Sequence, residues 1–193
     1  MKKSELRKKY LKLRRALSKD EVLLFSEKIF KNFNLQFKVS ENQNVHIFLP
    51  IDKLNEVNTK IFVDFLWERK VNVFVPKMKG DQLISIKLTP DTALKANAWG
   101  IEEPTKDFNE ANHFDWVITP MVYCDKNGNR IGYGKGFYDQ FFNTINADAL
   151  KIGVNFFSPN EEIEDVWEAD VRMDYLVTPF EILSFGRTSI STK

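Results

Sequence analysis

The chain has 193 residues, of which 43% are hydrophobic and 28% charged, with a formal net charge of +1. These values are ordinary for a globular protein and predict a single domain, residues 1–193. The near-zero charge offers no general attraction for nucleic acid or a membrane surface, so neither is expected as a partner. One cysteine, Cys124, excludes an intrachain disulfide and is expected to be a small buried side chain. Together with a charged start and no long apolar run, it predicts a cytoplasmic protein.

Two helices are expected at the start of the chain. Residues 4–17 carry an apolar stripe at helical spacing, formed by Leu6, Tyr10, Leu13 and Leu17. Ser18 and Glu21 have the spacing of a capping box, which predicts a second helix from there to about residue 33.

The rest of the chain alternates between strand and helix patterns. Apolar runs predict strands at 45–49, 71–75, 83–88, 114–119, 152–156 and 175–177. Further helices are expected at 61–68, capped by Asn58 and Thr59, and at 137–145. This alternation predicts an α/β fold with a mostly parallel sheet and helices on both faces. The end of the chain, from about residue 184 to 193, is polar and is expected to fray.

Residues 127–139, NGNRIGYGKGFYD, hold four of the eight glycines: Gly128, Gly132, Gly134 and Gly136. The segment follows an expected strand and precedes an expected helix, where α/β proteins bind ligands. Glycine amides beside a helix N-terminus can hold an anion, and Arg130 and Lys135 add positive charge. The spacing fits neither a P-loop nor a dinucleotide fingerprint. A glycine-rich hairpin without chemistry is therefore the alternative.

Acidic and basic side chains near this segment have two interpretations each. Asp139 is a suitable Mg²⁺ ligand beside a phosphate, or a partner of the helix dipole. Lys3, Arg7 and Arg14 line one edge of the first helix, where they can lean over a phosphate site or form a solvated face. His46 and His113 have no metal partner at ligand spacing and are expected to be structural.

Several segments together resemble the 5-formyltetrahydrofolate cyclo-ligase family. The main match is Asn129 to Asp139, which resembles the family signature N-R-[LI]-G-x-G-x-G-[YF]-Y-D. The early helix with Lys3 and Arg7, and the segments 55–59, 99–104 and 171–174, add weaker matches in the same order as in the family. The resemblance runs from Lys3 to about Thr178.

This resemblance implies a three-layer α/β/α fold like that of the NagB/RpiA/CoA-transferase group. It also implies conversion of 5-formyltetrahydrofolate and ATP to 5,10-methenyltetrahydrofolate, ADP and phosphate, with Mg²⁺. Such a reaction needs positioning and charge neutralisation rather than a nucleophilic side chain.

The resemblance assigns a role to each matching residue. ATP is expected at Lys3, Arg7, Arg130, Ile131, Gly132, Tyr133, Gly134, Lys135, Gly136, Phe137 and Tyr138. The folate substrate is expected at Glu56, Trp99, Tyr133, Gly134, Lys135, Gly136 and Phe137. Arg130 and Lys135 are the expected catalytic residues, and Asp139 and Asp174 the expected Mg²⁺ ligands.

Two other functions are compatible with the sequence. One is a protein of the same fold that uses ATP on another small substrate, for example in thiamine metabolism. The other is a nucleotide or phosphosugar sensor without turnover. Glu56 and Trp99 argue against the first, and the paired acidic residues against the second. The chain is expected to be a monomer or a weak homodimer.

Overall fold

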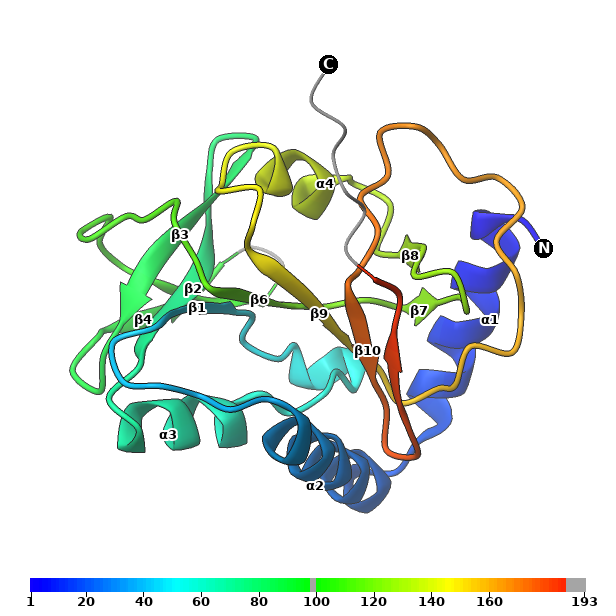
Figure 1. Ribbon diagram of the computed structural model, residues 1–193, viewed down its shortest axis with the longest axis horizontal. Helices are drawn as coiled ribbons and strands as arrows, with labels where there is room; N and C mark the ends of the chain where they lie inside the picture. Colours follow the sequence, from blue (N-terminus) through cyan, green and yellow to red (C-terminus); the bar gives the residue numbers. More distant parts are fainter. Residues whose placement is uncertain (98–99, 187–193) are drawn as a thin grey trace.

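The computed structural model describes residues 1–97 and 100–186, and it is built on one seven-stranded sheet (Figure 1). The strand order is β11-β10-β9-β6-β1-β2-β3. The bounds are β1 Asn44–Ile47, β2 Asn72–Lys79, β3 Gln82–Leu88, β6 Trp116–Thr119, β9 Leu150–Val154, β10 Tyr175–Val177 and β11 Ile182–Ser184. The five central strands are parallel, and β3 and β11 pair antiparallel at the two edges. The predicted α/β class with a mostly parallel sheet is confirmed.

Helices α2 (Lys19–Gln36) and α3 (Lys60–Glu68) cover one face of the sheet (Figure 1). They pack on alternate strand residues, among them Val45, Ile47, Val73, Val75, Trp116, Ile118, Ile152 and Val154. Ser18 and Glu21 form the predicted capping box, since Ser18 Oγ accepts from Glu21 N and Glu21 Oε2 accepts from Ser18 N. Because this cap fixes the start of α2, the second apolar helix lies along the sheet as expected.

The opposite face of the sheet has a thinner cover. The short helix α4 (Phe137–Phe142) and the side chains of Met121 and Met173 pack there against Val117 and Leu176. Gly153 of β9 makes room for this cover, because a Cβ at that position would lie 2.1 Å from the Met121 methyl carbon. Helix α4 ends at Phe142, so it is shorter than the helix predicted for residues 137–145.

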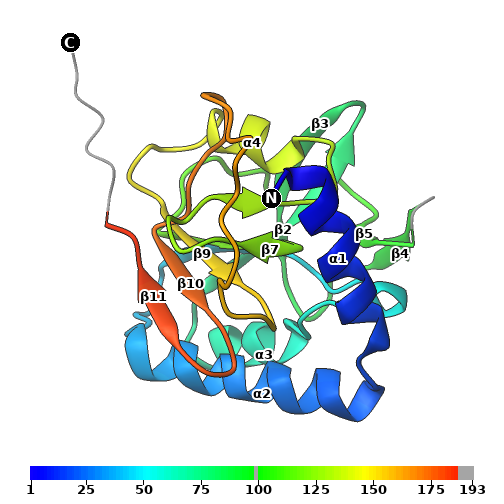
Figure 2. The same ribbon diagram turned by 90° about the vertical axis from the view of Figure 1, so that its right-hand side faces the viewer.

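Helix α1 (Lys3–Ala16) lies beyond the carboxyl ends of the parallel strands, against a hairpin of β7 (Tyr123–Cys124) and β8 (Arg130–Ile131) (Figure 2). Its apolar stripe is confirmed at Leu6 and Tyr10, which are buried against Tyr123 and Ile131. The rings of Tyr10 and Tyr123 stack with centroids 4.1 Å apart. Leu13 is instead 43% exposed, so the stripe covers only part of the predicted length.

Several short elements were not predicted. They are a 3₁₀ turn at Asp52–Leu54, the hairpin of β4 (Leu94–Ala96) and β5 (Glu102–Pro104), the β7–β8 hairpin, and β11. Strand β11 corrects the expectation of a frayed tail from residue 184, because Ser184 pairs with Tyr175 and the Phe185 amide donates to the Asp174 carbonyl oxygen. Residues 187–193, and Trp99, lie outside the described residues.

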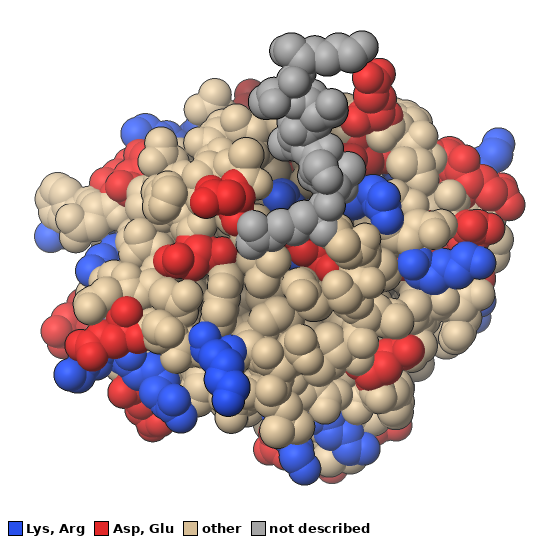
Figure 3. Space-filling model, viewed as in Figure 1, with Lys and Arg blue, Asp and Glu red and all other residues tan. Residues whose placement is uncertain are grey.

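On the face seen in Figure 3, positive and negative side chains are mixed, mostly around a broad uncharged centre, and the described residues visible there form no extended area of one sign. None of the helices in the described ranges has both the length and the apolar character needed to span a membrane.

Candidate active site

The glycine-rich stretch consists of two structures. Its first half is the turn of the β7–β8 hairpin, where the buried carboxylate of Asp125 accepts hydrogen bonds from the amides of Asn127 and Asn129, both 2.9 Å. Gly128 has a φ of +83°, and a Cβ there would lie 2.8 Å from the ring of Phe185. For this half the hairpin interpretation is correct, and Gly128 serves the fold.

The second half, residues 132–136, connects β8 to α4 and differs in character. Gly134 and Gly136 have left-handed backbones, with φ of +95° and +70°, and Gly136 is the N-cap of α4. Gly132 has no positive φ, and a Cβ there would meet no atom within 4 Å among the described residues. Neither the backbone conformation nor the neighbouring atoms therefore explain a glycine at 132, whereas close approach of a ligand would.

Helix α1 is tied to this second half through Arg7. Arg7 Nε donates a hydrogen bond of 2.8 Å to the Gly132 carbonyl oxygen, and its guanidinium lies close over Gly134. Lys3, one turn earlier, is ion-paired with Asp170 and lies 5.2 Å from the centroid of the Trp167 ring. Lys135 is exposed and has no ion pair or hydrogen bond within the described part of the chain. Arg7 therefore contacts the glycines and Lys135 belongs to their segment, and neither has an acidic partner among the described residues, whereas Lys3 is paired with Asp170.

Glu56 reaches the same place from the loop after β1. Asn55, in a left-handed conformation, donates its side-chain amide to the carbonyl oxygens of Arg14 and Leu17, at 3.1 and 2.8 Å. This contact ties the loop to the end of α1 and brings Glu56 beside Arg14. Glu56 is 5% exposed, and its Oε2 accepts a hydrogen bond of 2.8 Å from the Ile51 amide.

Tyr133 joins Glu56 to the glycine segment. Its hydroxyl donates to Glu56 Oε1 and accepts a hydrogen bond from Arg14, while the residue as a whole is 40% exposed. Burial raises the pKa of Glu56, and the Tyr133 hydrogen bond and the Arg14 charge oppose this rise. A carboxylate, a hydroxyl and a guanidinium therefore meet at one point of the carboxyl edge.

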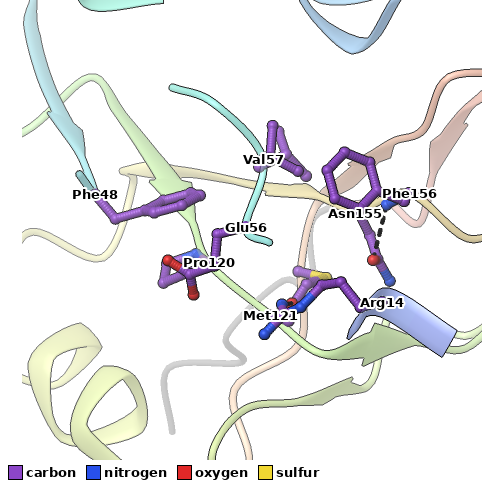
Figure 4. Close-up of a pocket in the computed structure, with 9 residues that line it drawn as sticks. Arg14, Phe48, Glu56, Val57, Pro120, Met121, Asn155 and Phe156 are labelled. Carbon is purple, nitrogen blue, oxygen red and sulfur yellow. Dashed lines mark hydrogen bonds between the residues drawn. The ribbon is translucent and has the colours of Figure 1, made fainter. Parts of the chain in front are cut away.

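A small pocket of about 10 Å³ lies behind this point. It is lined by Arg14, Phe48, Glu56, Val57, Pro120, Met121, Val154, Asn155 and Phe156. In Figure 4, Phe48, Pro120 and Glu56 form one side of the pocket, and Arg14, Met121 and Asn155 the other. The walls come from α1 and from the segments that follow β1, β6 and β9, as expected for a ligand site in a parallel sheet.

Arg130 and Asp139 form an ion pair on the inner side of the glycine segment. Arg130 Nη2 lies 2.7 Å from Asp139 Oδ1, and Arg130 also donates to the Val171 carbonyl oxygen. Asp139 accepts a further hydrogen bond, of 3.1 Å, from the Val171 amide. The Arg130 side chain is 5% exposed and that of Asp139 30%. The expected catalytic arginine and the expected metal ligand therefore neutralise each other in this structure.

Asp174 lies at the amino end of β10, the opposite edge of the sheet from the pocket. Its Oδ2 accepts a hydrogen bond of 2.8 Å from the Lys151 amide and lies 3.9 Å from Lys151 Nζ. Over residues 1–97 and 100–186, no three His, Cys, Asp or Glu side chains form a group that could hold a metal. Asp139, beside the glycines and partly exposed, fits a Mg²⁺ ion that arrives with phosphate oxygens as its other ligands. Asp174 has the contacts of a structural carboxylate.

His46 and Cys124 are buried, as their structural interpretation requires. His46 Nδ1 is hydrogen-bonded to Ser85 Oγ at 2.7 Å, and Nε2 to the Tyr138 hydroxyl at 3.1 Å. Burial lowers the pKa of His46 to about 3, so the ring is neutral at ordinary pH. Burial likewise raises the pKa of the Cys124 thiol, which makes it a poor nucleophile.

The protein is thus an α/β protein in which a glycine segment lies against a cationic helix at the carboxyl edge of a mostly parallel sheet, an arrangement suited to a small anionic molecule. Comparison with known proteins makes this class specific. The model of the 5-formyltetrahydrofolate cyclo-ligase family matches residues 1–179. The chain belongs to the 5-formyltetrahydrofolate cyclo-ligase family and is an enzyme of that class.

Individual relatives agree with the family match. The 5-formyltetrahydrofolate cyclo-ligase of Haemophilus influenzae is 32% identical over 121 residues, which are 59% of this chain and 64% of that protein, slightly under two thirds of its length. A probable 5-formyltetrahydrofolate cyclo-ligase of Caenorhabditis elegans is 26% identical over 198 residues, 95% of each chain.

Solved structures show the same fold. The NMR structure of Aquifex aeolicus 5,10-methenyltetrahydrofolate synthetase has a TM-score of 0.81 and 30% identity, and covers 100% of this chain and 97% of that one. The 5,10-methenyltetrahydrofolate synthetase of Mycoplasma pneumoniae has a TM-score of 0.70 and 25% identity, with 93% and 99% of the two chains covered.

Proposed function

We propose that this protein converts 5-formyltetrahydrofolate to 5,10-methenyltetrahydrofolate in the pocket beside the glycine segment, with ATP converted to ADP and phosphate. Membership of the family implies an ATP-dependent ligase that acts on folate. One observation supports the placement of both substrates here. Two adjacent residues of the glycine segment contact the two sides of the site. Gly132 is hydrogen-bonded to Arg7 on the proposed phosphate side, and Tyr133 to Glu56 on the proposed folate side. A single stretch of backbone can thus separate a phosphate from a pterin and still touch both.

The reaction needs an activated formyl oxygen, because a formamide carbon is a poor electrophile. Transfer of the γ-phosphoryl group to that oxygen makes it a leaving group. The neighbouring folate nitrogen then attacks the formyl carbon, and phosphate departs with the oxygen as the ring closes. A protein promotes this sequence by holding both substrates in line and neutralising phosphate charge. The many cations and backbone amides around residues 132–136 suit that task.

On the nucleotide side we assign Lys3, Arg7 and the segment Arg130 to Tyr138 to ATP. Arg7 and Lys135 support this assignment best, since one lies over the glycines and the other is unpaired. Lys135 is the side chain best placed to reach a transferring phosphoryl group, and we propose it as a catalytic residue. A catalytic role for Arg130 requires that its pair with Asp139 separates when nucleotide binds.

We propose that Mg²⁺ accompanies ATP and that Asp139 holds it. When bound, the ion neutralises charge on the phosphate oxygens of the nucleotide. The contacts of Asp174 with Lys151 support a structural role instead, so our proposal retains only one of the two expected ligands.

On the folate side we assign Glu56 to the pterin, whose amino-pyrimidine edge presents N–H donors to a carboxylate. The backbone of residues 133–137 would border the same ligand. Trp99, outside the described residues, remains our proposal for a ring that stacks on the pterin. We further propose that the protein works in the cytoplasm as a monomer or weak homodimer, without a nucleic-acid partner.

One assay tests the function. The protein is mixed with 5-formyltetrahydrofolate, ATP and Mg²⁺, and formation of methenyltetrahydrofolate is followed by absorbance. Product that requires all three additions supports the proposal. No product at high enzyme concentration, together with ATP hydrolysis on another small molecule, would favour a different substrate. Binding of ATP without turnover would favour a sensor.

A further inference from the structure

Arg14 has a buried donor without a partner. The residue is 3% exposed, and its Nε is the sole fully buried side-chain nitrogen or oxygen in the described ranges that lacks a hydrogen bond. Native proteins pair nearly all such groups, because an unpaired donor has lost its water and gained nothing. A buried N–H left open therefore indicates a group that is completed by something not present in the free chain.

The rest of Arg14 is fixed in place. One terminal nitrogen, Nη1, donates to the Met121 carbonyl oxygen at 3.2 Å, and the other, Nη2, donates to the Tyr133 hydroxyl. The backbone carbonyl oxygen of Arg14 accepts from the Asn55 amide. Two hydrogen bonds thus hold the guanidinium in the wall of the Glu56 pocket (Figure 4), and a third holds the backbone of the same residue, which preorganises the side chain for binding.

The Tyr133 hydroxyl occupies the space between Arg14 and Glu56, and it bonds both. It accepts from the guanidinium and donates to the carboxylate, so it presents one acceptor and one donor to the pair. A planar heterocycle with neighbouring N–H and carbonyl or imine groups presents the same two functions. Since Tyr133 as a whole is 40% exposed and lies on a glycine-flanked segment, its side chain can move outward when such a ligand enters.

We propose that Arg14 is a second polar contact for the folate substrate, with its Nε–H donating to an acceptor atom on the pterin edge whose donors are bound by Glu56. The inference rests on the proposed function and extends it by one residue. It identifies the ligand's edge as a mixed one, with donors toward Glu56 and an acceptor toward α1. The Tyr133 hydroxyl holds the two protein groups in position until the ligand replaces it.

The test compares three variants in the full-length protein. Arg14→Met removes all donors at similar length, Arg14→Lys keeps the charge, and Tyr133→Phe removes only the hydroxyl. For each, the Kd of 5-formyltetrahydrofolate is measured without ATP, and the Kd of ATP without folate. The KM for each substrate follows in the spectrophotometric assay, and circular dichroism reports folding.

We expect Arg14→Met to weaken folate binding about 10- to 100-fold and Arg14→Lys about 10-fold, as for loss of a buried charged hydrogen bond. The Kd of ATP should change less than about twofold in both. Tyr133→Phe should bind folate more tightly, because the hydroxyl that competes for Arg14 and Glu56 is gone. If Arg14→Met does not fold, Arg14→Lys alone decides.

Three results would overturn the inference. They are an unchanged folate Kd in both Arg14 variants, an equal loss for folate and ATP, and a loss in Tyr133→Phe as large as that in Arg14→Met. The unchanged protein separates this failure from failure of the proposed function. If it neither binds nor converts 5-formyltetrahydrofolate, the function itself is wrong. If it does both and the Arg14 variants do too, only the role of Arg14 is wrong.

Discussion

Arg7 Nε and the Gly132 carbonyl oxygen, 125 residues apart in the chain, are joined by a hydrogen bond of 2.8 Å. The bond fixes the first helix against the segment that we assign to phosphate. It also leaves the terminal nitrogen Nη2 of the guanidinium close to Gly134, in position to donate to a phosphate oxygen. The predictions below begin with this contact.

Replacing Arg7 with Met should weaken the binding of ATP but not that of folate. Loss of a charged donor to a phosphate typically lowers affinity about 10- to 100-fold, so the KM for ATP should rise by that factor while the KM for folate stays within about twofold. Arg15, which is exposed and has no pairing contact in the described part of the chain, provides a matched control. An equal rise in Arg15→Met would show that overall charge, rather than this contact, attracts the nucleotide.

Replacing Gly132 or Gly128 with alanine should have opposite effects on ATP affinity and on stability. In Gly132→Ala, the added Cβ meets no atom of the described residues within 4 Å and the backbone is not left-handed. The melting temperature of this variant should therefore be unchanged while its affinity for ATP falls. Gly128→Ala must adopt a φ of +83° and place its Cβ 2.8 Å from Phe185. It should lose about 1–3 kcal/mol of stability and bind ATP normally in its folded fraction. Thermal melts with and without ATP separate the cases, and normal ATP affinity in Gly132→Ala would remove Gly132 from the phosphate site.

Asp139 and Asp174 should differ in what their loss affects. Asp139→Asn should lower turnover by at least about 100-fold, as expected for loss of the proposed metal ligand. It should also lower the free energy of unfolding, because the buried Arg130 guanidinium loses its counter-charge. Asp174→Asn loses a charge that is buried beside Lys151, and should lower the free energy of unfolding by about 1–3 kcal/mol while folded enzyme keeps its rate. Turnover and urea denaturation are measured for both. An unchanged rate in Asp139→Asn, or a collapse of rate without loss of stability in Asp174→Asn, would reverse the two assignments.

Stability should depend on pH through His46. Burial lowers its pKa to about 3, against about 6.5 for an exposed imidazole. Between these values the unfolded chain binds a proton that the folded chain does not. The free energy of unfolding should therefore fall as the pH is lowered, by up to ~1.4 kcal/mol per pH unit from this group.

Urea denaturation from about pH 7.5 to about pH 5 measures this slope, and His46→Gln, which cannot take up the proton, should have a shallower one. The comparison is needed because Glu56 acts in the opposite direction. Burial raises the pKa of Glu56, so its protonation at low pH favours the folded chain. Equal slopes in the two proteins would contradict the prediction.

The larger elements could be predicted because each carries its own local signal. The Ser18 and Glu21 pair marked the start of α2, and runs of apolar residues marked β1, β2, β3, β6, β9 and β10. The strands β7, β8 and β11 have two or three residues, too few to show a period, and β10, which is equally short, was found because all three of its residues are apolar or aromatic. They depend on pairing with other parts of the chain, and no local sequence pattern indicates that pairing.

The site shows the same division. The glycine segment and Arg7 were found from residue types and resemblance, and the structure brings them together. The contacts of Glu56 with Tyr133 and Arg14 could not be read from spacing, because they join three segments that are distant in the sequence. The first helix pattern placed Arg14 at the edge of the stripe, but burial, which gives the residue its role, appears only when the loop of Asn55 closes over it.

Helix α1 is synthesised first, but most of the residues that it packs against are synthesised much later. Lys3 pairs with Asp170, Tyr10 bonds Glu161 and stacks on Tyr123, so most partners of α1 come more than 100 residues later. While the chain emerges from the ribosome, the apolar side of this helix has nothing to pack on. Non-local contacts of this kind also form slowly in folding. A chain arrested before residue 121 would therefore hold β1, β2, β3 and β6 but lack most of the residues against which α1 packs, so this helix can dock only after the second half of the chain has been made.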